Sequence, residues 1–189
     1  MEALTRLLDA NSTLKDATSG LVKISKAAEK AKIPGACVVQ LIAGGFLQHV
    51  VRIDGISGLE GLRVCPAEVK KVASTTLIGM TASEAFAALK LNKDAGWELV
   101  GRPCDEVSLT PYMVTGVGSD FTIARFLPES VAAFGARFTT LAHAADKHGT
   151  GVKDHRGSLK KIGVKPAVPW SDIGVEIYQV SDVAKVLPA

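Results

Sequence analysis

The chain has 189 residues, of which 47% are hydrophobic and 5% aromatic, and its formal net charge is +3. This length is enough for one domain with its own core, and the mild charge does not by itself indicate a nucleic-acid-binding protein. The three cysteines lie far apart without a CxxC pair, which argues against a disulfide framework, and no signal peptide or membrane-spanning segment is expected.

The first predicted element is a long helix over residues 3–32. Leucines recur every seven residues, and an isoleucine lies at the complementary offset among alanines. This heptad pattern predicts a seam that packs either on the core of the same domain or on another subunit. A break at residues 11–13 is the alternative, because Asn, Ser and Thr favour helix caps. The interface predicted for an oligomer consists of Leu7, Leu14, Leu21 and Ile24.

Residues 36–53 fit two structures. Gly44 and Gly45 separate two apolar runs, which favours a β-hairpin, whereas a buried helix beginning at Pro34 is the alternative. The sequence does not separate these two. A glycine-rich loop, a short strand and a helix from Pro66 are predicted next.

The middle of the chain reads as a helix followed by strands. The sequence from Thr81 to Glu84 matches a capping box, which predicts a helix over residues 82–92. Strands are predicted at residues 97–101 and, on both sides of a glycine turn, within 112–126.

The most regular stripe of apolar residues predicts a strong amphipathic helix over residues 128–148, with Pro128 in its first turn. A basic, glycine-rich loop follows, and residues 175–180 read as a strand. The predicted fold is therefore α+β: a long N-terminal helix, short mixed or antiparallel strands and interleaved helices. We predict one domain over residues 1–189, with 1–32 as a helical arm, and no internal repeat.

The basic loop is the main candidate for a functional site. Between residues 147 and 165 it carries six Lys or Arg side chains and a single acidic residue after Asp146, and its glycines allow close approach to an anion. A solvated loop without function is the alternative. The predicted phosphate-binding residues are Lys153, His155, Arg156, Lys160, Lys161 and Lys165.

Metal binding and catalysis have weaker support. The candidate metal ligands are His143, Asp146, His148, Asp154 and His155. Only His143 and Asp146 have the spacing of a helical ligand pair, and no zinc-binding motif supports them, so no metal or other cofactor is predicted. No nucleophile elbow or phosphate-binding glycine motif occurs, so no catalytic residue is assigned.

These features favour a self-assembling structural protein, such as a viral or phage coat or nucleocapsid subunit, whose basic loop contacts RNA or DNA through the phosphate backbone. Its expected partners are further copies of the chain and nucleic acid, with no membrane, and its expected location is the cytoplasm or a virion. A small cytoplasmic enzyme is the alternative, with His155, Arg156 and Asp120 as candidates. An adaptor or binding module is a third class.

Overall fold

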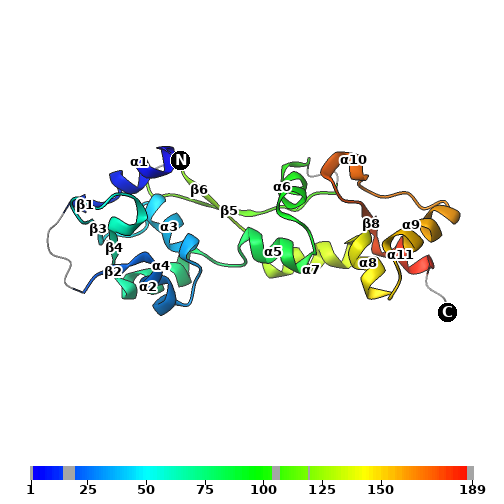
Figure 1. Cartoon of the computed structure of the whole chain (residues 1–189), viewed down its shortest axis with the longest axis horizontal. Helices are drawn as coiled ribbons and strands as arrows, with labels where there is room; N and C mark the ends of the chain where they lie inside the picture. Colours follow the sequence, from blue (N-terminus) through cyan, green and yellow to red (C-terminus); the bar gives the residue numbers. More distant parts are fainter. Residues whose placement is uncertain (1, 15–19, 104–106, 119, 187–189) are drawn as a thin grey trace. The chain divides into compact units, whose positions relative to one another are not determined.

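The computed structural model describes residues 2–14, 20–103, 107–118 and 120–186. The protein is α+β, as the sequence predicts, and its short, mostly antiparallel strands alternate with helices (Figure 1). No helix in these ranges is both long and apolar enough to cross a membrane.

The chain divides into two compact units. Unit 1 comprises Met1–Ile78 and Met113–Ala124, and unit 2 comprises Gly79–Tyr112 and Arg125–Ala189. The division does not test the prediction of a single domain, because two compact units of one chain can still unfold together in a single cooperative transition.

Unit 1 contains helices packed around a four-stranded sheet of order β1-β3-β4-β2. Strand β1 lies parallel to β3, whereas β3–β4 and β2–β4 are antiparallel pairs. The hairpin of β5 and β6 follows later in the chain. The elements are α1 (Glu2–Ala10), β1 (Thr13–Leu14), β2 (Val22–Lys23), α2 (Ile24–Ala31), α3 (Gly35–Ala43), β3 (Val50–Arg52), η1 (Gly58–Gly61), β4 (Leu62–Val64), α4 (Pro66–Thr76), β5 (Tyr112–Thr115) and β6 (Thr122–Arg125). The first residue of β5 and the last residue of β6 belong to unit 2.

The core of unit 1 forms where α2 and α3 pack on α4 and on the sheet. Each of these helices contributes apolar side chains from one face, which is the burial that stabilises a short amphipathic helix. The most buried members of this core include Ala27, Val38, Leu41, Ile42, Leu62, Val64 and Val69.

The prediction of a long N-terminal helix is wrong. Helix α1 ends at Ala10, where the side chain of Asn11 donates a hydrogen bond from Nδ2 to the carbonyl oxygen of Ala43 at 3.2 Å. Strands β1 and β2 follow before α2 begins at Ile24. The heptad pattern is therefore divided among separate elements, because pairing with β3 and β4 stabilises extended backbone over part of it.

Two segments predicted as strands are helices. The hairpin favoured at Gly44 is absent from the described structure, and the helix that the sequence left as the alternative is present as α3, with Pro34 as its N-cap residue. Residues 97–101 belong to α6, where the side chain of Asn92 accepts a hydrogen bond from the backbone N–H of Ala95 at 2.8 Å. Both helices are short, and α3 is largely buried, a case that periodicity does not distinguish from strands.

Unit 2 contains pairs of helices and a small antiparallel sheet. Strand β7 pairs with β8, and two single-residue bridges join Met80 to Phe126 and Val168 to Ile177. The capping box predicted at Thr81 is confirmed at the start of α5. The elements are α5 (Ala82–Ala88), α6 (Lys93–Gly101), α7 (Pro128–Arg137), β7 (Phe138–Thr140), α8 (Leu141–Lys147), α9 (Val152–Lys161), α10 (Trp170–Ile173), β8 (Ile177–Gln179), α11 (Val180–Val183) and η2 (Ala184–Val186).

The single helix predicted over residues 128–148 is wrong, because it is two helices, α7 and α8, separated by strand β7. Phe138 is extended, with φ of −130° and ψ of 146°, and β7 pairs with β8. The hydroxyl of Thr140 then accepts a hydrogen bond from the backbone N–H of His143 at 3.1 Å and caps α8. Aromatic and β-branched residues favour a strand at this point, and the pairing with β8 overrides the helical stripe.

The same order of elements occurs in both units. In unit 1 it runs β2, α2, α3, β3, η1, β4, and in unit 2 it runs β7, α8, α9, Val168, α10, β8. In each unit the last strand lies between the other two and is antiparallel to both. A topological repeat is therefore present although none is visible in the sequence, because each copy needs apolar side chains at only a few buried positions.

Candidate nucleic-acid interface

Helices α8 and α9 of unit 2 form a helix–turn–helix arrangement. They pack on each other and are joined by a four-residue turn, His148 to Gly151. Gly149 in this turn has φ of 62°, a left-handed conformation that glycine adopts without steric cost. A short turn that contains glycine is typical of this motif, whose second helix enters the major groove in DNA-binding proteins.

The inner face of α9 is fixed by two side chains four residues apart. Leu159 is fully buried and His155 is 3% exposed, so both point from α9 into unit 2. Leu159 belongs to a small apolar cluster that joins α8 and α9 to β8 and α11. The buried members of this cluster are Leu141, Ala144, Leu159, Tyr178 and Val183.

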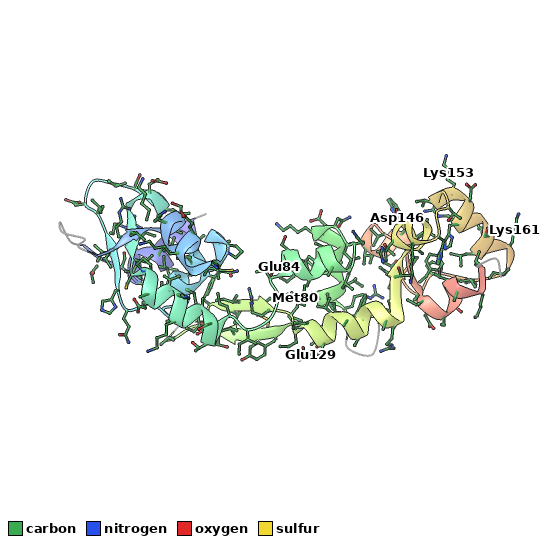
Figure 2. The ribbon with its side chains drawn as sticks, turned by 90° about the horizontal axis from the view of Figure 1, so that it is seen from below. Met80, Glu84, Glu129, Asp146, Lys153 and Lys161 are labelled. Atoms are coloured by element: carbon green, nitrogen blue, oxygen red, sulfur yellow. The ribbon has the colours of Figure 1, made fainter. Side chains whose placement is uncertain are left out.

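The outer face of α9 is basic. Lys153, Arg156, Lys160 and Lys161 are exposed, and Lys153 and Lys161 project outward from α9 in Figure 2. At 3.6 residues per turn, Lys153, Arg156 and Lys160 share one face. Asp154 in the first turn and the two lysines in the last turn also suit the helix dipole, so these charges favour the helix itself.

Arg156 is held by a carboxylate from another element. Its Nε donates a hydrogen bond to Oε2 of Glu176 at 2.9 Å. The side chain of Glu176 is 16% exposed, whereas that of Arg156 is 48% exposed. The carboxylate is therefore fixed near the protein interior while the guanidinium reaches the surface.

Two histidines stack where the turn meets α9. The ring of His148 lies on that of His155 with 5.6 Å between centroids and 17° between planes. Nδ1 of His155 lies 3.3 Å from the hydroxyl oxygen of Thr150, and its Nε2 is buried without a hydrogen-bond partner among the described residues. Burial, and to a lesser degree His148, lowers the pKa of His155 below the usual histidine value, so the neutral ring is favoured.

The other two helix pairs in the described structure present different outer faces. Helix α3 has no charged residue, and its outer residues Ala36, Val39 and Gln40 line a mostly apolar pocket of about 760 Å³ within unit 1. Helix α6 exposes Trp97 and charged residues of both signs, namely two acidic residues and one lysine. Among these three second helices, α9 therefore has the only surface complementary to phosphate.

The segment predicted as a basic loop is mostly the helix α9. Of the six predicted phosphate-binding residues, five have exposed side chains: Lys153, Arg156, Lys160, Lys161 and Lys165. Lys165 lies beyond the end of α9. His155 is buried, so we do not include it in the basic face.

The candidate metal ligands and enzyme residues were also located in the structure. Among the residues that the structure describes, no group of three or more His, Cys, Asp or Glu side chains is arranged to hold a metal ion. Of the enzyme candidates, Asp120 belongs to unit 1, whereas His155 and Arg156 belong to unit 2.

The predicted oligomer interface does not lie on one helix. Leu7 packs against the core of unit 1 from α1, and Ile24, which begins α2, is 8% exposed within that core. Leu21 precedes β2 and is half-buried, and the side chain of Leu14 lies outside the described part of the chain. Assembly through these residues stays a prediction.

The sequence did not indicate Glu176 or Thr150 as parts of the site. Glu176 lies 20 residues from Arg156, and no local spacing connects the two. The four-residue spacing of His155 and Leu159 was a usable signal, because one buried stripe beside a run of lysines indicates an amphipathic helix rather than a loop.

Comparisons of the chain with protein families, with curated proteins and with solved structures gave no match.

Proposed function

We propose that this protein binds duplex DNA through the α8–α9 helix–turn–helix, with α9 in the major groove. The observation that carries the proposal is the placement of four exposed cations on the second helix, whose opposite face is anchored by His155 and Leu159. A helix fixed in this way presents its cations together as one surface, whereas a flexible loop would lose entropy on binding.

The lysines suit contacts with the DNA backbone. Lys153, Lys160 and Lys161 carry flexible point charges, and lysines that neutralise phosphates release condensed counterions. The major groove of B-DNA admits an α-helix, whereas the major groove of duplex RNA is too narrow for side chains to read. These arguments favour duplex DNA over duplex RNA.

The coat or nucleocapsid role stays a prediction, and so does a location in the cytoplasm or a virion. The proposed nucleic-acid contact agrees with that prediction in kind, but it lies on the helix α9 rather than on a loop. Self-association through the N-terminal residues is a separate hypothesis, which an oligomer measurement with Leu7 and Leu21 variants would address. The enzyme alternative also stays a prediction.

The test is the salt dependence of binding to a mixed-sequence DNA duplex, measured by fluorescence anisotropy between about 50 and 200 mM salt. We expect the full chain to bind, and we expect K160A/K161A to bind more weakly. The slope of log K against log salt should become shallower by about 0.9 for each phosphate contact that is lost.

The matched control is K70A/K71A, which removes an adjacent pair of exposed lysines from α4 in unit 1. It changes the net charge by the same amount, so an equal loss in both variants would show a general charge effect and count against the α9 surface. Failure of the unmodified chain to bind any duplex would overturn the proposal.

A further inference from the structure

Arg156 differs from the lysines beside it because one end of its guanidinium is already held. Its only hydrogen bond within the described part of the chain runs from Nε to Glu176 at 2.9 Å. The two Nη groups of the same planar group therefore have no protein partner there. A guanidinium fixed through Nε presents its Nη pair in a defined direction, which lowers the entropy lost on forming two further hydrogen bonds.

The carboxylate that holds Arg156 is itself fixed. The carbonyl oxygen of Glu176 accepts a hydrogen bond from the backbone N–H of Leu141, the first residue of α8, at 3.0 Å. The next residue, Ile177, pairs with Thr140 on one side and Val168 on the other. Glu176 thus connects the small sheet, the start of α8 and the outer face of α9.

Arg156 also occupies a suitable place on the helix. It lies in the first half of α9, and the N-terminal residues of a recognition helix are those that contact base edges. Lys153 and Lys160 lie on the same face, one turn before and one turn after it. Cations on both sides suit contacts to phosphates, which position the helix but carry no sequence information.

We propose that Arg156, oriented by Glu176, is the specificity-determining residue of α9 and recognises a guanine by donating from both Nη groups to O6 and N7 in the major groove. This inference rests on the proposed binding of duplex DNA. Among the bases, guanine presents two acceptors side by side at that edge, and a bidentate arginine pair is the commonest specific contact with it. Glu176 is a positioning residue, because it acts through Arg156.

The alternative is that the pair only ties β8 to α9. A lysine at position 156 would keep the charge attraction to Glu176. A structural tie would therefore tolerate R156K without changing any base preference. Base recognition would not tolerate it, because lysine lacks the planar two-pronged donor set.

The experiment begins with selection of duplexes from a randomised library by the full chain. Kd is then measured for the selected duplex, for a duplex with its most enriched G·C pair changed to A·T, and for one with 7-deazaguanine, which lacks N7, at that guanine. We expect the unmodified chain to discriminate against A·T by about 5- to 150-fold and to lose affinity for the 7-deaza duplex.

Four variants separate the roles. R156K should bind all three duplexes within about twofold of one another while keeping the salt slope, because the charge is retained. E176A should reduce discrimination, and E176Q should restore most of it, because an amide oxygen also accepts from Nε. The control K161A should weaken binding to all three duplexes equally and preserve their ratios.

The outcomes separate this inference from the proposed function. Binding without any guanine preference, or unchanged discrimination in R156K, would overturn the role of Arg156 and leave DNA binding standing. Absence of binding to every duplex would overturn the proposed function and this inference with it. Circular dichroism of each variant establishes that a loss of discrimination does not result from unfolding.

Discussion

At the scale of single residues, α9 assigns opposite roles to neighbours in the sequence. His155 is buried and packs on His148, whereas Arg156, the next residue and about 100° further around the helix, reaches solvent. Leu159 and Lys160 repeat this contrast one turn later. Each turn of α9 therefore carries one buried side chain, His155 or Leu159, and one exposed cation. The buried side chain fixes the helix and so determines where the cation lies.

His155 makes the stability of unit 2 dependent on pH. Its pKa in the folded state is lowered by burial and by His148, so the unfolded chain takes up a proton at a higher pH than the folded chain does. The contribution of the neutral ring to stability is complete above the ordinary value of 6.5 and decreases as the pH falls below it.

We therefore expect the thermal midpoint of the unmodified protein to decrease between about pH 7.5 and about pH 5.5. H155Q, which does not titrate in this range, should show a smaller decrease, as measured by circular dichroism. An equal decrease in both proteins would show that His155 is not the group responsible. Carboxylates titrate mainly below this range and contribute little to the difference.

At the scale of the element, the turn between α8 and α9 depends on one glycine conformation. Gly149 has φ of 62°, and a Cβ built there meets no atom within 4 Å, so any cost of a side chain is conformational rather than steric crowding by neighbours. Gly157 lies inside α9 without a positive φ, and its position is equally open. Substitution of these two glycines by alanine therefore compares two open positions that differ in backbone conformation.

G149A should destabilise unit 2 by about 1–2 kcal/mol, because alanine in the left-handed region has this cost. G157A should stabilise it by about 0.5–1 kcal/mol, because alanine is the better helix former. Urea unfolding at neutral pH measures both free energies. The same sign for the two variants would contradict the described boundary between turn and helix.

Sequence patterns located elements best where caps and prolines mark their ends. The capping box at Thr81, the helix starts at Pro66 and Pro128, and the strand within residues 175–180 are all confirmed. Predictions failed where strand pairing with distant residues overrides a helical pattern, as at Phe138, and where short buried helices resemble strands. Those interactions lie outside any local sequence window.

The candidate site was predictable in part. Its lysines and Arg156 stand out as a basic run, but the sequence predicts a loop there rather than the helix α9. Gly157 is tolerated inside α9 because His155 and Leu159 hold the helix on both sides of it. The contact with Glu176 forms only when β8 returns beside α8, and no sequence spacing reports it.

At the scale of the whole molecule, the chain contains several pairs of short helices whose exposed surfaces differ in charge. The described structure contains three pairs of helices, α2–α3, α5–α6 and α8–α9, in which the two helices are joined by three or four residues. The buried face of each second helix packs into the core. The outer face is apolar in α3, carries more acidic than basic residues in α6, and is basic in α9. Only the last is suited to a polyanion.

The most direct test of the central claim is hydrogen–deuterium exchange of the full chain with and without a saturating DNA duplex. We predict that slower exchange on binding is concentrated in peptides from residues 152–161, with little change in 35–43 and 93–101. Protection of α3 or α6 while α9 exchanges unchanged would contradict the account, because it would assign the DNA contact to a different helix pair.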